Sequence, residues 1–134
     1  MHPGQYTVLN SPRPEVFQCA VDELRHHAGL LDLLGTSQSS KIVVHAGGAF
    51  GDPSAAVDGF VRAVRSLPSD IRRRLVVEND GRVFGAAEVL DATASAGIPV
   101  GFDWLHHRVL DGVQAARFLA EIKARIEKPY FVIG

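Results

Sequence analysis

Polar side chains that could bind a metal or transfer a proton stand at the ends of three apolar runs. His45, Glu78 and Asp103 are each the last residue of such a run, and each is followed by a turn or a glycine-rich loop. The carboxyl ends of parallel strands open on one side of a sheet, so residues at these ends converge although they are far apart in sequence. We therefore expect one imidazole and two carboxylates to face a common space.

Two further histidines could join this set. His106 lies three residues after Asp103, and His2 would cap a strand whose body precedes the first residue. Mixed nitrogen and oxygen ligands suit Mn²⁺, Zn²⁺ or Fe²⁺, and a bridging cation stabilises carboxylates that would otherwise repel each other. A single His or Asp at a strand end is more often a hydrogen-bonded loop residue than a ligand. Its recurrence at three successive strands favours a shared metal site or acid–base site.

The elements that must position these residues are short strands alternating with helices. Four apolar runs, rich in β-branched residues and nearly uninterrupted, are typical of parallel strands that are covered on both faces. The predicted strands are Lys41–His45, Leu75–Glu78, Ile98–Asp103 and Tyr130–Ile133. Apolar residues at spacings of three and four predict helices between them. The predicted helices are Pro14–Leu34, Pro53–Leu67, Gly85–Ala96 and a stripe from Val113 to Ile126, with a short turn at Ser69–Arg73.

Alternation of helices and strands predicts parallel βα units in an α/β fold. Two architectures share this pattern, an open doubly wound sheet and a closed eight-stranded (βα) barrel. A whole barrel needs about 250 residues, so a chain of 134 residues could supply about half of one. No linker or low-complexity tract divides the chain, and residues 1–134 are expected to form a single partial-barrel domain.

Composition limits the classes of partner. The chain has 14 Lys and Arg, 15 Asp and Glu and a formal net charge of −1, so it has no general basic field that would attract polyanions. Any contact with nucleic acid must therefore come from a local patch. The densest group of cations is Arg72–Arg74, with Arg62 and Arg65 upstream, and it is expected to be a solvated helix face and turn.

The cysteine content and the hydropathy pattern bear on location. Because Cys19 is the only cysteine, no internal disulfide can form, and no paired-cysteine zinc site is present. This favours a reducing compartment, and the cytoplasm is the expected location. No stretch approaches the roughly 18 apolar residues of a membrane span, and the first residues are not those of a signal peptide. We expect no membrane partner.

Four motifs taken together resemble the UV damage endonuclease family. They occur in the family's order between about residue 2 and residue 110: His2-Pro3-Gly4-Gln5-Tyr6 with Leu9-Asn10-Ser11-Pro12, Val44-His45-Ala46-Gly47-Gly48, Val77-Glu78-Asn79-Asp80, and Phe102-Asp103-Trp104-Leu105-His106-His107-Arg108. The resemblance implies the central part of a (βα) barrel related to xylose isomerase and endonuclease IV. It also implies an enzyme that incises damaged double-stranded DNA on the 5′ side of UV photoproducts and uses a cluster of divalent metals, typically Mn²⁺.

The resemblance also assigns roles by position. It implies that the metal ligands are His2, His45, Glu78, Asp103 and His106, of which His45, Glu78 and Asp103 are the expected catalytic residues. It implies that Gln5 and Tyr6 probe the lesion by inserting into the duplex. Arg108 is a candidate phosphate contact, although a salt bridge would explain it equally well.

The chain departs from the family's pattern in two places. Leu105 stands where a further histidine is usual, and the segment from Leu110 to Gly134 shows no motif of the family. Members of the family are longer, and their outer segments supply further ligands, including a modified lysine. We therefore expect an incomplete metal cluster in this chain.

Three functions from different classes follow from these observations. The first is a UV damage endonuclease or a truncated relative of it. The second is a non-catalytic half-barrel module that binds at most one metal and pairs with itself or with another half barrel, since uncovered sheet edges invite association. The third is a small-molecule isomerase or hydrolase on the same type of barrel, which the Gln5-Tyr6 pair disfavours because a sugar site has little use for a duplex probe.

Overall fold

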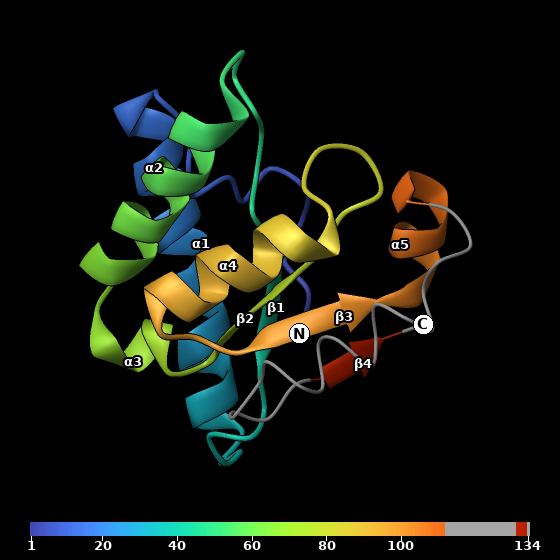
Figure 1. Ribbon diagram of the computed structural model, residues 1–134. Coiled ribbons are helices and arrows are strands. Elements are labelled where there is room, and N and C mark those ends of the chain that lie inside the picture. The colour runs from blue at the N-terminus through green and yellow to red at the C-terminus, as the bar shows by residue number, and fades with distance from the viewer. Residues whose placement is uncertain (112–130, 134) are drawn as a thin grey trace.

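A computed structural model of the protein describes residues 1–111 and 131–133. Four strands form one parallel sheet in the order β1 (Ile42–His45), β2 (Leu75–Glu78), β3 (Val100–Asp103) and β4 (Phe131–Ile133) (Figure 1). The predicted α/β class with parallel βα units is confirmed.

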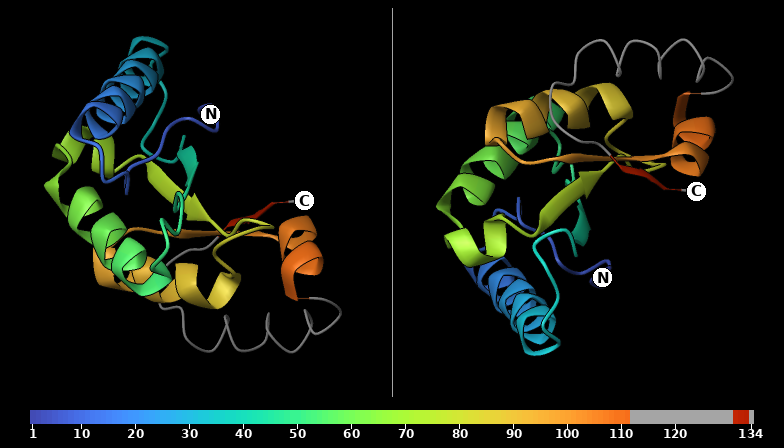
Figure 2. Two further views of the ribbon diagram at one scale, coloured as in Figure 1. Left: turned by 90° about the horizontal axis from the view of Figure 1, so that it is seen from above. Right: turned by 90° about the horizontal axis from the view of Figure 1, so that it is seen from below.

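Helices cover one side of this sheet. The helices are α1 (Pro14–Leu33), α2 (Pro53–Ser66), α3 (Ser69–Arg72), α4 (Ala86–Ala96) and α5 (Trp104–Asp111). Figure 2 shows α1, α2 and α4 along the outer, convex side of a curved sheet, with the N-terminal segment on the other side. This is the arrangement of a partial barrel. In the described ranges no helix is long and apolar enough to cross a membrane.

Local sequence signals set the ends of the helices. The side chain of Asp52 accepts a hydrogen bond from the backbone N–H of Ala55 at 3.0 Å, and Pro53 is the first residue of α2. Gly97 ends α4 with a φ of +74°, a conformation that glycine adopts without steric cost. These helices lie within two residues of their predicted bounds. The helix predicted between Val113 and Ile126 lies outside the described residues.

Helix α5 was not anticipated by the periodicity. It begins directly after β3, and its large apolar residues Trp104, Leu105 and Val109 are exposed by 37%, 62% and 68%. A helix of eight residues is shorter than the window of about 11–18 residues in which apolar periodicity is recognised. The Asp103 carboxylate accepts the backbone N–H of His106 and so caps the first turn of α5.

The core lies between the sheet and the outer helices. Leu24 of α1, Phe60 of α2 and Leu75 of β2 are completely buried, and every residue of β2 is buried. Burying a side chain of this size stabilises the fold by about 1.5–3 kcal/mol. One face of each strand therefore packs against the helices. The alternate residues of the same strand point toward the concave side of the sheet.

Arg74 corrects the expectation for the arginine cluster. Arg73 lies exposed as predicted, but the side chain of Arg74 is only 2% exposed. Its guanidinium donates to the Asp32 carboxylate and to the carbonyls of Ser37 and Ser40 at 3.0 and 3.1 Å. The fork of five N–H donors in arginine suits a loop that presents several carbonyls. Arg74 therefore holds the connection between α1 and β1 in place.

Replacement of Arg74 by Ala is expected to lower the free energy of unfolding by about 2 kcal/mol, because part-buried loop carbonyls lose their donor and an ion pair loses its buried partner. The matched control, Arg73→Ala, removes an exposed arginine that lies 3.9 Å from the same Asp32 carboxylate, and its cost should stay below about 1 kcal/mol. Urea unfolding followed by circular dichroism measures both values. Equal losses in the two variants would contradict the role of Arg74.

Candidate metal centre

A buried carboxylate lies at the centre of the carboxyl end of the sheet. Glu78, the last residue of β2, is 3% exposed, and its Oε1 lies 2.8 Å from His2 Nε2 and 3.2 Å from His45 Nε2. Each of the three residues offers a ligand atom, and these atoms lie within 4.8 Å of one another. Two imidazoles and one carboxylate from separate segments thus share one small volume.

The sheet itself positions His45 against Glu78. The two residues are register partners in the parallel pairing of β1 with β2, so their side chains leave the sheet side by side. His45 is held between two other imidazoles, with ring centroids 5.4 Å from His2 and 5.6 Å from His106. His106 therefore joins the same cluster through its contact with His45.

His2 is positioned by pairing of the first residue with β1. The backbone N–H of Val43 donates to the Met1 carbonyl at 2.9 Å, and the Met1 amine donates to the Lys41 carbonyl at 2.7 Å. His2 Nδ1 bonds the Pro3 carbonyl at 3.0 Å, which leaves Nε2 directed at Glu78. The sequence predicts that His2 follows a strand. In the structure, the residue before it, Met1, pairs with β1.

Asp103 and His106 lie next to this group but are not among the three residues whose ligand atoms lie within 4.8 Å of one another. Asp103 Oδ2 lies 3.6 Å from His106 Nδ1, and the same nitrogen bonds the carbonyl of Asn79 at 3.0 Å. A histidine with one ring nitrogen bonded to a carbonyl presents its other nitrogen for ligation in a defined orientation. The described residues therefore place all five predicted ligands at the carboxyl ends of β1, β2 and β3 or directly beside them.

Asn79 is a site residue that the sequence reasoning missed. Its side chain is buried, donates to the Asp103 carbonyl at 2.9 Å and accepts the Asp103 N–H at 2.8 Å. This pair of bonds ties the end of β3 to the end of β2, so Asn79 positions Asp103 through its backbone. The sequence feature that could have identified Asn79 is its position directly after Glu78, the carboxylate residue that ends the strand.

Asp80 organises the loop that follows. Its carboxylate accepts the backbone N–H groups of Arg82, Val83 and Phe84 at 2.7, 2.5 and 3.3 Å. An Asp that binds successive backbone amides closes a tight loop. Burial lowers the pKa of His45, and the negative charge of Asp80 opposes part of this effect, so the charge of Asp80 reaches the site.

The two histidines that contact Glu78 differ in their acid–base behaviour. Burial is the largest influence on His45 and lowers its pKa, and the attraction of Glu78 only partly opposes this effect. Burial also acts to lower the pKa of His2, but the hydrogen bonds to Glu78 and to the Pro3 carbonyl outweigh it, and the pKa is raised overall. His45 therefore favours the neutral form, the form in which histidine binds metals.

The remaining predicted residues lie on the surface around this centre. Gln5 and Tyr6 are the central residues of a turn closed by a 3.0 Å bond from the Thr7 N–H to the Gly4 carbonyl, and both are exposed. A small hollow of about 30 Å³ is lined by Gln5 together with His2 and His45, so the turn adjoins the centre. Arg108 lies exposed on α5, and within the described part of the chain it makes no ion pair.

The residues present fit a divalent cation. His45 Nδ1 is buried and has no hydrogen-bond partner in the described structure, and Glu78 Oε1 is approached by two imidazole nitrogens. An unpartnered buried nitrogen is costly unless it meets another ligand. One oxygen and several imidazole nitrogens are a donor set that suits Mn²⁺, Zn²⁺ or Fe²⁺. The cluster could therefore hold a metal.

Comparisons with known proteins agree on one family. The family model described as "UV-endonuclease UvdE" matches residues 1–128. The UV DNA damage endonuclease of Clostridium perfringens is 40% identical over 107 residues, which cover 80% of this chain and 26% of that protein. The enzyme of the same name from Bacillus cereus strain Q1 is 37% identical over 106 residues, 79% of this chain and 33% of that protein.

A solved structure gives the same result in three dimensions. The crystal structure of SacUVDE superposes with a TM-score of 0.87 at 39% sequence identity, and the match covers 98% of this chain and 45% of that one. The chain thus spans a third or less of the curated relatives and under half of the solved structure. The family match also reaches residue 128, so the family's pattern continues beyond Leu110, where no motif was recognised.

Replacement of Glu78 by Gln is expected to weaken Mn²⁺ binding at least about 100-fold, because the amide keeps the size of the side chain but loses the anionic ligand. Calorimetric titration of the metal-stripped chain measures the affinity. Thermal melting should show that the variant remains folded. Unchanged affinity in a folded Glu78→Gln variant would rule out this residue as a ligand.

Replacement of Asn79 by Ala is expected to weaken Mn²⁺ binding about 10- to 100-fold, because the end of β3 loses both bonds that align Asp103. The same titration serves as the measurement, with Arg108→Ala as a control for an exposed change near the site. If Asn79→Ala destabilises the fold but binds Mn²⁺ as the unaltered chain does, Asn79 has no positioning role in the centre.

Proposed function

The chain belongs to the UV-endonuclease UvdE family, and we propose that it acts in metal-dependent incision of damaged double-stranded DNA on the 5′ side of UV photoproducts. The observation that carries the proposal is the convergence of His2, His45 and Glu78 ligand atoms within 4.8 Å of one another. Because the chain spans 26% to 45% of its relatives, the activity of the whole protein is part of this proposal.

The proposed metal ligands are the three strand-end residues His45, Glu78 and Asp103 together with His2 and His106. His2, His45 and Glu78 would form one group, and Asp103 with His106 would extend it through the contact between the His106 and His45 rings. Mn²⁺ is the proposed ion. A divalent cation in such a site supplies neutralisation of the scissile phosphate, a hydroxide near neutral pH and stabilisation of the leaving oxygen.

The catalytic contribution of the protein itself lies in charge and orientation. Glu78 presents a buried carboxylate oxygen to two imidazoles, and Asp103 holds its position through bonds from Asn79 to its backbone. Groups fixed before the substrate arrives need no reorganisation during the reaction. We therefore assign the catalytic role to His45, Glu78 and Asp103.

Damaged DNA is the proposed partner, and the exposed loops around the centre are its proposed contact surface. In the Gln5-Tyr6 turn, the amide residue Gln5 lines the hollow that also contains His2 and His45, and the next residue, Tyr6, presents an exposed aromatic ring. Such groups can fill the gap left when poorly stacked bases leave the duplex. Arg108 is exposed and free of ion pairs among the described residues, which suits a phosphate contact.

A second candidate is a non-catalytic half barrel that self-associates and binds at most one metal. The observation in its favour is that β1 and β4 are the two outer strands of the described sheet, and β1 has only the pairing with Met1 on its outer side. Strand edges of this kind can pair with a second copy or with another half barrel.

Under both candidate functions we propose that residues 1–134 form one domain and that the protein is cytoplasmic.

Incision of a UV-irradiated, end-labelled duplex in Mn²⁺ tests the proposal. We expect cuts on the 5′ side of photoproducts that disappear with EDTA and in Glu78→Gln. Tyr6→Ala should lower incision about fivefold or more through lost base stacking and should leave Mn²⁺ affinity unchanged. Absence of metal-dependent incision, together with a dimer in analytical ultracentrifugation, would instead support the half-barrel module.

A further inference from the structure

Phe50 is an exposed aromatic residue with an unusual backbone conformation. It lies in the loop between β1 and α2, and it is 55% exposed. Within the described residues it is the only non-glycine residue with a positive φ, at +50°. A bulky side chain is a genuine outlier in this region, which Gly, Asn or Asp adopts far more easily.

The surrounding loop imposes this conformation. Asn10 donates to the Gly48 carbonyl at 2.8 Å and accepts the Gly48 N–H at 3.2 Å. A Cβ at Gly47 would lie 2.0 Å from Asn10 Oδ1, so only glycine allows this close approach. The Asp52 N–H then donates to the Ala49 carbonyl at 3.0 Å, which makes Phe50 a central residue of a tight turn. The N-terminal loop therefore fixes where the Phe50 ring stands.

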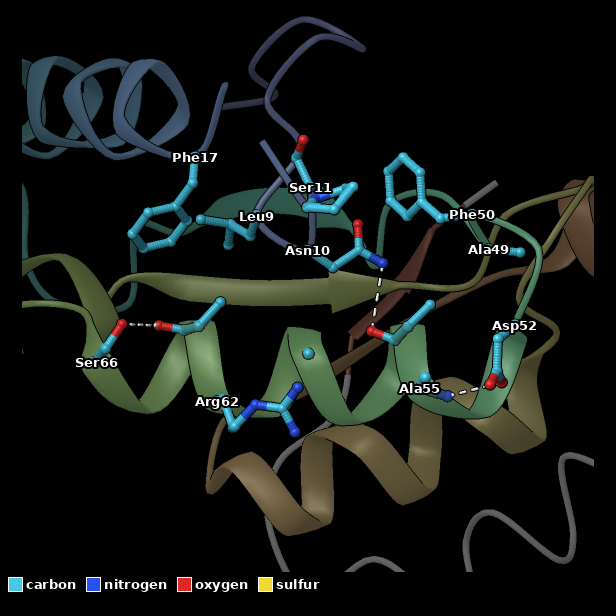
Figure 3. A pocket seen from close by; sticks show the side chains of 14 residues that line it. Leu9, Asn10, Ser11, Phe17, Ala49, Phe50, Asp52, Ala55, Arg62 and Ser66 are labelled. Atoms are coloured by element: carbon cyan, nitrogen blue, oxygen red, sulfur yellow. Dashed lines mark hydrogen bonds between the residues drawn. The ribbon is translucent and has the colours of Figure 1, made fainter. Parts of the chain in front are cut away.

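The ring of Phe50 borders an open apolar hollow that also contains Tyr6. This hollow has a volume of about 570 Å³, and its other apolar walls are Val8, Pro12 and Val16. Tyr6 is 83% exposed. A neighbouring hollow of about 560 Å³ shares Phe50 and Pro12 with the first, and Figure 3 shows Phe50 beside Ser11 at one end of it, opposite Phe17. Phe50 thus stands between two hollows at the carboxyl end of the sheet.

Neither the exposure nor the strain of Phe50 contributes to folding. An aromatic ring that remains more than half exposed gains little from burial, and glycine would adopt the positive φ without strain. Strained conformations that the surroundings impose are concentrated at functional sites. Two exposed aromatic rings around one apolar hollow suit a flat, aromatic ligand. At the end of the sheet that holds a candidate phosphodiesterase centre, a nucleobase is such a ligand.

We propose that Phe50 stacks on an unpaired nucleobase of DNA that enters the hollow shared with Tyr6. The inference rests on the proposed function to the extent that the chain acts on DNA. Every base has a π-face, so stacking on Phe50 tolerates different bases. Ser11, Arg13 and Glu15 also line the hollow and can hydrogen-bond the polar edge of the base.

Binding to a duplex that contains a two-base bulge with 2-aminopurine tests the proposal. The measurement is made in EDTA, so it does not depend on a metal or on incision. We expect the full chain to bind the probe and to quench its fluorescence. Phe50→Leu and Phe50→Gly should each weaken binding about fivefold or more, whereas Phe50→Tyr keeps the ring and should retain it.

Two controls separate stacking from folding. Phe50→Gly relieves the positive φ, so its melting temperature should equal or exceed that of the unaltered chain while its DNA binding falls. Leu33→Ala removes an 87% exposed apolar side chain from the end of α1 and should leave probe binding unchanged. A loss of stability in parallel with the loss of binding in Phe50→Gly would overturn the proposal.

The outcomes also distinguish this inference from the proposed function when incision in Mn²⁺ is measured in parallel. Probe binding that depends on Phe50, without metal-dependent incision, would support the stacking role of Phe50 and contradict the proposed endonuclease activity. The opposite outcome is metal-dependent incision together with equal probe binding by the unaltered chain, Phe50→Leu and Phe50→Gly. It would support the proposed endonuclease activity and overturn the stacking role of Phe50. Failure of the unaltered chain to bind the bulged probe would also overturn it.

Discussion

The structure depends most on the burial of one carboxylate at the end of β2. Glu78 is 3% exposed, and removal of a carboxylate from water is costly unless other groups compensate. His45 compensates because parallel register places it beside Glu78, and His2 does so because Met1 pairs with β1. The strand ends are therefore held close together by the same contacts that create a donor set for a cation.

Two asparagines extend this constraint to the loops. Asn79 joins the end of β2 to Asp103, and Asn10 joins the N-terminal loop to Gly48 in the loop after β1. Amide side chains suit this task because each offers a donor and an acceptor to a backbone segment. The side chains of the candidate metal centre and the exposed aromatic residues Tyr6 and Phe50 are thus carried by loops that these hydrogen bonds connect. A change in either asparagine is expected to affect the proposed metal binding and DNA contact as well as stability.

The sequence predicts the parallel βα order and the meeting of His45 with Glu78, because both follow from short apolar runs that end in a polar residue. Arg74 escaped prediction because most of its partners are loop carbonyls, which have no signature in the sequence. Helix α5 was not predicted because its eight residues are too few for an apolar repeat to be recognised. The role of Asn79 depends on the backbone of Asp103, 24 residues away, and such a contact appears only after the strands are assembled.

The central claim is that the residues around Glu78 form a metal centre. Anomalous scattering from crystals of the chain grown with Mn²⁺ tests it most directly, because the ion is located without reference to activity. The account predicts an anomalous peak in contact with the Glu78 carboxylate and with ring nitrogens of His2 and His45. Ordered, unliganded density for these three side chains, or Mn²⁺ bound only elsewhere on the chain, would contradict it.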